Sequence, residues 1–119
     1  MTHPMDYFER IFIINLPSRT DRQAEIAAQL KAIGLSLDDA NLELFPAVRP
    51  DAAEGFPSIG ARGCFMSHLG VLRTARDLGL QRVAIFEDDL DFVGDFNSRF
   101  QSLVEQLQRV DWSIFYGGY

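Results

Sequence analysis

The feature that most constrains the fold of this chain is an alternation of short apolar runs with segments that repeat apolar residues at helical spacing. Residues 11–14 are all apolar, which is typical of a parallel strand buried on both faces. Further strands are predicted at 42–45, 83–86 and 112–116, and helices after Thr20, from about Met66 to Leu78, and around 100–107. This order predicts an α/β fold whose mostly parallel sheet carries helices on both faces.

The predicted helices have local start and stop signals. Thr20, with Gln23 three residues later, resembles a capping box at the start of the first helix, and Gly34 is suited to end it. Gly79 is suited to end the second helix in the same way. Residues 49–63 are rich in Pro, Gly, Ala and Asp, so we expect a long loop there.

The length and charge limit the class of protein. With 119 residues the chain has room for one domain, 1–119, and its 47% hydrophobic content is sufficient for a packed core. Its formal net charge of −6 argues against a nucleic-acid-binding protein, which would present a basic face. Ligands of a small acidic domain are therefore expected to bind locally, through a few arginines or a metal.

The sequence also indicates a cellular location. The polar N-terminal residues do not resemble a signal peptide, and no apolar run approaches the roughly 20 residues of a transmembrane helix. Cys64 is the single cysteine, which fits a reducing compartment. We therefore expect a cytoplasmic protein, with the periphery of the inner membrane as an alternative location.

An acidic cluster, Glu87-Asp88-Asp89, directly follows the predicted strand 83–86. Ligands of open α/β sheets bind at the carboxyl ends of the strands, which is where this cluster lies. Crowded carboxylates repel one another unless a cation or several donors neutralise them, and oxygen-rich sites suit Mg²⁺ or Mn²⁺. In an extended strand Glu87 and Asp89 point to one side and Asp88 to the other. The cluster predicts a metal site, and the alternative is a solvated acidic loop.

A second group of polar residues joins the strand at 11–14 to the following helix. Asn15 ends the strand, and Arg19 and Arg22 lie three positions apart around the expected helix N-terminus. Free N–H groups and the helix dipole favour an anion there, and two guanidinium groups could converge on a diphosphate. The alternative is an ordinary strand-to-helix turn with solvated arginines.

A third group lies at the expected start of the second helix. Ser67 could cap this helix, and His68 could donate a hydrogen bond to a phosphate or a sugar hydroxyl. A single histidine in a first helical turn is more often structural or solvated. Cys64 stands between a glycine and a phenylalanine, which favours a small buried residue over a metal ligand.

Taken in order, the three groups resemble the motifs of glycosyltransferase family 25. This family includes the lipooligosaccharide galactosyltransferase-type enzymes and the collagen galactosyltransferases. The resemblance extends over nearly the whole chain, from about residue 11 to residue 116. The residues that carry it are Ile14-Asn15-Leu16 with Arg19 and Asp21-Arg22, then Gly63-Cys64 with Ser67-His68, then Phe86-Glu87-Asp88-Asp89.

This resemblance implies the Rossmann-like half of a GT-A-type fold that binds a UDP-sugar. Mn²⁺ or Mg²⁺ would bridge the diphosphate and the acidic cluster, and its charge would stabilise the departing UDP. The implied reaction transfers galactose to a saccharide or lipid-linked saccharide acceptor in lipopolysaccharide or lipooligosaccharide biosynthesis. The residues implied to lie near the nucleotide sugar are Asn15, Arg19, Arg22, Ser67 and His68, and the implied metal ligands are Glu87, Asp88 and Asp89.

Members of this family are considerably longer than 119 residues, so we expect this chain to correspond to the N-terminal, donor-binding part. The catalytic base would come from the acceptor-binding part, so no catalytic residue is predicted. Two alternatives to a transferase stay open. One is a non-catalytic module that binds the nucleotide sugar, and the other is an oligomeric scaffold, a homo-oligomer in which a second copy covers an open sheet edge.

Overall fold

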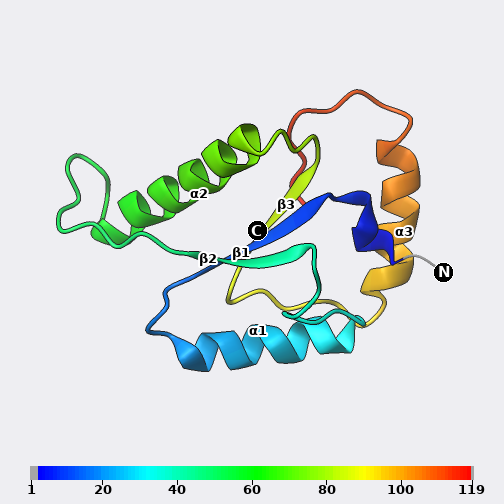
Figure 1. Cartoon of the computed structure of the whole chain (residues 1–119), viewed down its shortest axis with the longest axis horizontal. Coiled ribbons are helices and arrows are strands. Elements are labelled where there is room, and N and C mark those ends of the chain that lie inside the picture. The colour runs from blue at the N-terminus through cyan, green and yellow to red at the C-terminus, as the bar shows by residue number, and fades with distance from the viewer. Residues whose placement is uncertain (1–2, 119) are drawn as a thin grey trace.

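The computed structural model describes residues 3–118 and has a parallel sheet at its centre. The strands β1 (Arg10–Asn15), β2 (Leu42–Pro46) and β3 (Val83–Glu87) stand in the order β2-β1-β3 (Figure 1). Ile11 lies opposite Leu42 in one neighbour and Ala84 in the other. All three strands run in the same direction, so their carboxyl ends meet at one edge of the sheet.

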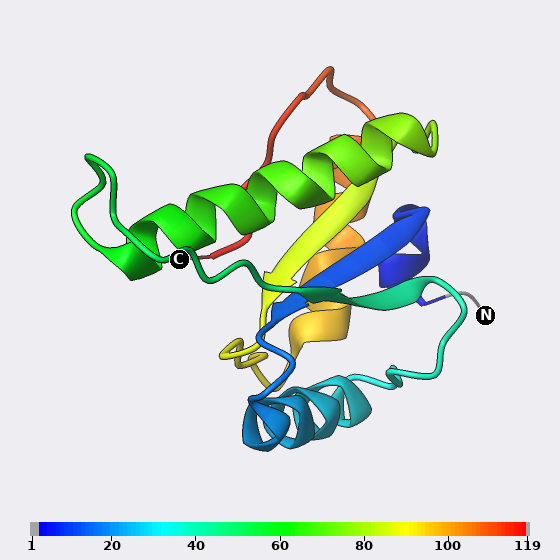
Figure 2. The ribbon, with the colours of Figure 1, turned by 60° about the vertical axis from the view of Figure 1, so that its left-hand side comes forward.

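Helices cover both faces of this sheet, as the sequence predicts. The helices α1 (Thr20–Ala32) and α3 (Phe96–Leu107) pack on one face together with a short 3₁₀ helix, η1 (Pro4–Tyr7). The helix α2 (Ile59–Asp77) packs on the other, and Figure 2 shows the strands between α1 and α2. The predicted α/β class with a parallel sheet, consistent with a Rossmann-like half fold, is confirmed.

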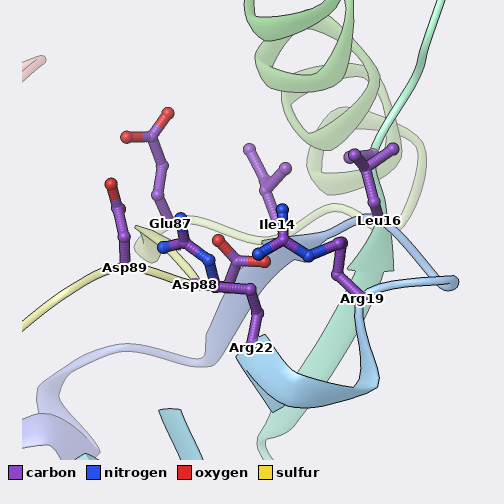
Figure 3. A pocket seen from close by; sticks show the side chains of 8 residues that line it. Ile14, Leu16, Arg19, Arg22, Glu87, Asp88 and Asp89 are labelled. Atoms are coloured by element: carbon purple, nitrogen blue, oxygen red, sulfur yellow. The ribbon is translucent and has the colours of Figure 1, made fainter. Parts of the chain in front are cut away.

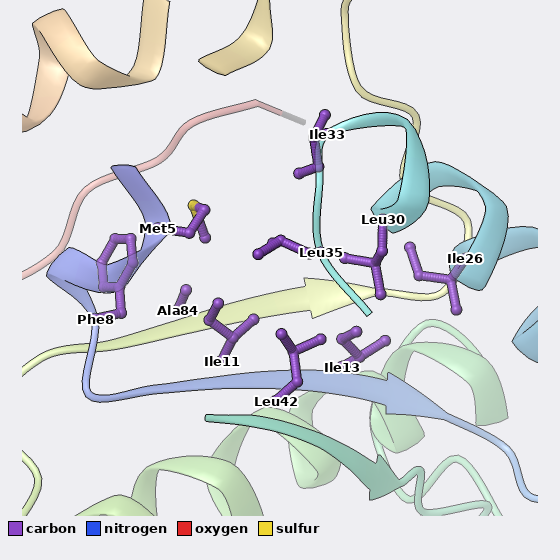
Figure 4. Packing of buried hydrophobic residues seen from close by; sticks show 10 residues of the cluster. All are labelled: Met5, Phe8, Ile11, Ile13, Ile26, Leu30, Ile33, Leu35, Leu42 and Ala84. Carbon is purple, nitrogen blue, oxygen red and sulfur yellow. The ribbon is translucent and has the colours of Figure 1, made fainter. Parts of the chain in front are cut away.

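The larger hydrophobic core lies between the sheet and α1. Ile11 and Ile13 project into it from β1 and are fully buried (Figure 4). Burying one such side chain contributes about 1.5–3 kcal/mol, so this cluster supplies most of the stability of the fold. Its buried members are Met5, Phe8, Ile11, Ile13, Ile26, Leu30, Ile33, Leu35, Leu42 and Ala84.

The smaller core lies between the sheet and α2. Phe12 and Ile14 alternate with the residues of the larger core along β1, and they meet Val71 of α2. Both faces of β1 are therefore buried, which explains its continuous apolar run. The outer side of α2 exposes apolar side chains, with Phe65 at 55% and Leu72 at 53% of their full accessibility.

The start of α2 differs from the prediction. The helix begins at Ile59 rather than at about Met66, so the preceding loop is shorter than expected. The Ser58 hydroxyl accepts a hydrogen bond from the Ala61 N–H and caps the helix. Gly63 lies inside this helix, at a position where a β-carbon would stand 2.6 Å from the Val48 carbonyl oxygen, so only glycine fits there. Gly63, one of the glycines that suggested a loop, thus serves close packing of a helix.

The predicted capping box at Thr20 is wrong. The N-cap residue is Arg19, which makes no side-chain cap, and the Gln23 amide donates instead to the side-chain oxygen of Asn15. The predicted ends of the first two helices are confirmed. Gly34 and Gly79 follow them with φ of +85° and +70°, a conformation that glycine adopts without strain.

The predicted strand over 112–116 is also wrong. After α3 the chain turns back, and the Trp112 indole N–H donates to the Tyr7 hydroxyl at 3.2 Å. Ile114 and Tyr116 are 72% and 76% exposed and pair with no strand of residues 3–118. An apolar run becomes a strand only where a sheet edge receives it, and here Trp112 anchors the segment against η1. None of the described helices is both long and apolar enough to cross a bilayer.

Candidate functional site

An open pocket lies at the carboxyl ends of β1 and β3, where Arg19 and Arg22 face the acidic cluster. Figure 3 shows the guanidinium groups and the carboxylates around one opening. The arginines come from the turn before α1 and from its first turn, and the acids come from the end of β3 and the residues after it. The lining residues are Ile14, Leu16, Arg19, Arg22, Ala47, Glu87, Asp88 and Asp89.

Asn15 connects three elements beneath this pocket. Its side chain is buried, and its amide N–H donates to the Asp88 carboxylate at 2.8 Å. The Gln23 amide donates to the Asn15 oxygen at 2.9 Å. A chain of hydrogen bonds therefore runs from α1 through the end of β1 to the turn after β3. It holds one carboxylate of the acidic cluster in place.

Arg19 is partly neutralised by a neighbouring acid. Its guanidinium donates to both carboxylate oxygens of Asp21, each at 3.0 Å. This hydrogen-bonded pair lowers the pKa of Asp21 to about 2 and raises the pKa of Arg19. Within residues 3–118, Arg22 has no carboxylate within 4.0 Å, so its charge is the more available to a ligand.

The acidic cluster divides between the two faces of the sheet. Asp88 turns toward Asn15, whereas Glu87 faces α2 and contacts Cys64 and His68. Glu87 and Asp88 thus point in opposite directions, as expected for neighbours at the end of a strand. Asp89 is exposed and also lines the pocket.

Ser67 has a structural environment. It is fully buried inside α2, so the prediction that it caps a helix is wrong. Its hydroxyl accepts a hydrogen bond from the Val48 N–H at 2.8 Å and donates to the Gly63 carbonyl at 2.7 Å. The Val48 bond attaches α2 to the segment that follows β2, the Gly63 bond lies within α2, and Ser67 does not line the pocket.

His68 and Cys64 form a separate group with Glu87. The Nε2 atom of His68 lies 3.7 Å from Glu87 Oε1, and the Cys64 thiol donates to the same oxygen at 3.5 Å. Cys64 is exposed, so the expectation of a small buried residue is wrong. Partial burial and the Glu87 carboxylate raise the pKa of this thiol.

Sequence reasoning missed this group because it began the helix too late. With α2 starting at Ile59, Cys64 and His68 lie four residues apart on one helical face. With the correct helix boundary, this four-residue spacing would have predicted that the two side chains lie close together. The three ligand atoms of Cys64, His68 and Glu87 lie within 4.8 Å of one another.

The fold and the pocket place the chain among α/β proteins with a Rossmann-like parallel sheet and a polar site at the carboxyl ends of its strands. Residues 8–117 match the family model described as glycosyltransferase family 25 (LPS biosynthesis protein). The chain belongs to this family, which confirms the resemblance seen in its motifs.

Curated relatives support this assignment over most of the chain. Procollagen galactosyltransferase 1 of Danio rerio is 33% identical over 93% of this chain, and procollagen galactosyltransferase 2 of Homo sapiens is 30% identical over 93%. The inactive glycosyltransferase 25 family member 3 of Mus musculus is 27% identical over 93%. The chain spans 21%, 21% and 22% of these relatives, respectively. No solved structure gives a significant match.

Proposed function

We propose that this chain binds the nucleotide-sugar donor of a glycosyltransferase, with a UDP-sugar in the pocket between α1 and the acidic cluster. The observation that carries the proposal is the single pocket lined by Arg19, Arg22 and all three acids of the cluster. Membership of a glycosyltransferase family supports this ligand over other diphosphates. Family membership and the parallel sheet also favour a GT-A-type arrangement of the fold around this ligand.

The basic side of the pocket suits a diphosphate. The N-cap residue of α1, Arg19, makes no side-chain cap, and the positive end of the helix dipole favours phosphate oxygens there. Arg22 supplies an unpaired guanidinium within the described residues, and Arg19 supplies a second that shares its charge with Asp21. These groups would hold the diphosphate and orient the sugar toward the open side of the pocket.

The acidic side of the pocket suits Mn²⁺ or Mg²⁺. Glu87, Asp88 and Asp89 offer hard carboxylate oxygens, the ligands these ions prefer, and Asn15 already orients Asp88. When bound, the metal would supply positive charge that stabilises the diphosphate leaving group. An acceptor hydroxyl would attack the anomeric carbon while the bond to the diphosphate breaks. No residue of this chain is assigned as the base.

The finer identity of the reaction is part of the same proposal. Two relatives are named as procollagen galactosyltransferases, which favours galactose as the sugar. The family description names lipopolysaccharide biosynthesis, which favours a saccharide or lipid-linked saccharide acceptor at the cytoplasmic side of a membrane.

A non-catalytic binding module is the second candidate. Relatives named as inactive members of the family are 27% and 26% identical to this chain. In such a module the pocket would still bind the nucleotide sugar, and transfer would require a partner or be absent. The two candidates share the binding step and differ only in turnover.

Calorimetric titration with UDP and UDP-galactose, with and without Mn²⁺, tests the binding step. We expect Mn²⁺-dependent binding that Arg22→Ala weakens roughly tenfold, the loss of one charge-assisted contact. Arg109→Ala, which changes an exposed arginine after α3, is the matched control and should bind as the unchanged protein does. Absence of metal-dependent binding at millimolar UDP would refute the proposal and favour the scaffold alternative. Release of free galactose, or its transfer to an acceptor, would show that the chain is an enzyme rather than a binding module.

A further inference from the structure

Cys64, His68 and Glu87 bring three different metal-binding groups together beside the proposed donor pocket. Cys64 and His68 project from successive turns of α2, and Glu87 meets them from the end of β3. Cys64 and His68 do not line the pocket, so they belong to a separate cluster that shares only Glu87 with it.

The distances in this cluster match those between the ligands of a small tetrahedral ion. Zn²⁺ binds sulfur, nitrogen and oxygen at about 2.0–2.3 Å, which separates neighbouring ligand atoms by about 3.4–3.6 Å. The Glu87 Oε1 atom lies 3.5 Å from Cys64 Sγ and 3.7 Å from His68 Nε2. The three atoms lie within 4.8 Å of one another, so small side-chain rotations would complete the geometry.

The types of metal-ligating atom distinguish this cluster from the acidic one. A thiolate, an imidazole and a carboxylate form a mixed set that Zn²⁺ accepts readily, whereas Mg²⁺ and Mn²⁺ prefer oxygen alone. Both helical ligands are also accessible, because Cys64 is exposed and the His68 side chain is 40% exposed. An ion could therefore enter from solvent without unfolding α2.

We propose that Cys64, His68 and Glu87 form a binding site for Zn²⁺, with the fourth coordination position open to water. The thiol loses its proton to solvent when the metal binds. The bound ion joins α2 to the end of β3 and engages the Glu87 carboxylate. The site goes beyond the proposed donor binding, because it requires neither a nucleotide nor the arginines. It shares Glu87 with the donor pocket, so a donor-bound Mn²⁺ or Mg²⁺ would then rely on Asp88 and Asp89.

Competition titration of Zn²⁺ against a chromogenic chelator, in the absence of nucleotide, tests the site on the whole chain. We expect one Zn²⁺ per chain, and Cys64→Ser and His68→Ala should each weaken binding at least tenfold. Asp91→Asn, which removes an exposed carboxylate near the same turn, should leave the affinity unchanged. Zinc affinity that is insensitive to both ligand substitutions would overturn the proposal.

Cobalt substitution supplies a second measurement that does not depend on affinity. A Co²⁺ complex of the unchanged protein should show a thiolate-to-metal charge-transfer band, and this band should disappear in Cys64→Ser. Circular dichroism of each variant checks that the fold is retained. Because no nucleotide is present, failure of this site and failure of UDP binding are separate results. A Co²⁺ spectrum without a thiolate band would also overturn the proposal.

Discussion

At the scale of single residues, Asn15 does the most to organise the candidate donor pocket. It is 3% exposed, and its side chain receives a hydrogen bond from Gln23 and donates one to Asp88. Loss of one of these partners would leave a buried amide group without a hydrogen bond and would lower the stability of the fold by about 1–3 kcal/mol. Asn15 therefore serves the site through the position of Asp88 rather than through the pocket lining.

The first prediction concerns the pair of Arg19 and Asp21. Carboxyl ¹³C NMR should show Asp21 titrating at about 2, below its usual 3.8, because the Arg19 guanidinium bonds to the ionised form. The pKa is lowered by folding, so the stabilisation is present above pH 3.8 and is lost as pH falls toward 2. Both side chains are exposed, so the effect on overall stability is small.

Two variants isolate the cause of this shift. Arg19→Ala should move the Asp21 midpoint back toward 3.8. Arg22→Ala should leave it in place, because Arg22 contributes to Asp21 through its backbone N–H, which alanine retains. An Asp21 midpoint near 3.8 in the unchanged protein would show that the pair does not persist in solution.

The positions of some candidate site residues could be predicted from the sequence and those of others could not, for a physical reason. Arg19, Arg22 and Asp89 could be placed around one pocket because parallel strands share a carboxyl edge. The environments of Cys64 and Ser67 could not be predicted in the same way. Each depends on which face of α2 meets the sheet, and that requires the true start of the helix.

At the scale of elements, α2 shows how glycine can serve a helix rather than a loop. The backbone of this helix approaches the segment after β2 so closely that only a hydrogen fits at Gly63. Ser67 binds the same segment one turn later through the Val48 N–H. Together these contacts fix the height of α2 above the sheet, and with it the position of the Cys64–His68 face.

The second prediction compares two glycines of α2. Gly63→Ala should destabilise the fold by roughly 1–3 kcal/mol, because the new β-carbon would stand 2.6 Å from the Val48 carbonyl oxygen. Gly60→Ala is the matched control: its nearest neighbour is 3.8 Å away, and alanine should stabilise the helix by up to about 1 kcal/mol. Urea denaturation measures both free energies of unfolding. Equal values for the two variants would contradict the close contact.

The elements themselves were predictable where burial on both faces imposed the pattern. The strand at 11–14 and the stop signals at Gly34 and Gly79 were correct because backbone geometry dictates them locally. The strand expected at 112–116 did not form, although β2 and β3 each have an open edge within residues 3–118. Trp112 instead contacts Tyr7, a distant interaction that no local pattern records.

At the scale of the whole molecule, the two faces of the sheet are unequally stabilised. The face toward α1 holds most of the buried apolar side chains, whereas the buried apolar cluster between the sheet and α2 is small and consists of Phe12, Ile14 and Val71. Helix stability in proteins comes mainly from such packing. The molecule is therefore expected to open first at α2.

The third prediction tests this difference by amide hydrogen exchange. Leu30 in α1 and Val71 in α2 are both fully buried helical residues, so they form a matched pair. We expect the Val71 amide to have roughly tenfold lower protection, because α2 can separate from the sheet without disrupting the larger core. Equal protection of the two amides would mean that the molecule opens as one unit. Added Zn²⁺ should raise protection in α2 if the proposed site forms.

The central place of β1 has a consequence for synthesis of the chain. Arg10 pairs with Val83, so the ribosome must add 73 residues (83 − 10) before the second neighbour of this strand exists. At about 5–20 residues per second this takes roughly 4–15 seconds. During that time an apolar strand has an unpaired edge, which invites contact between nascent chains. The same strand that later stabilises both faces is thus the segment most in need of a chaperone during translation.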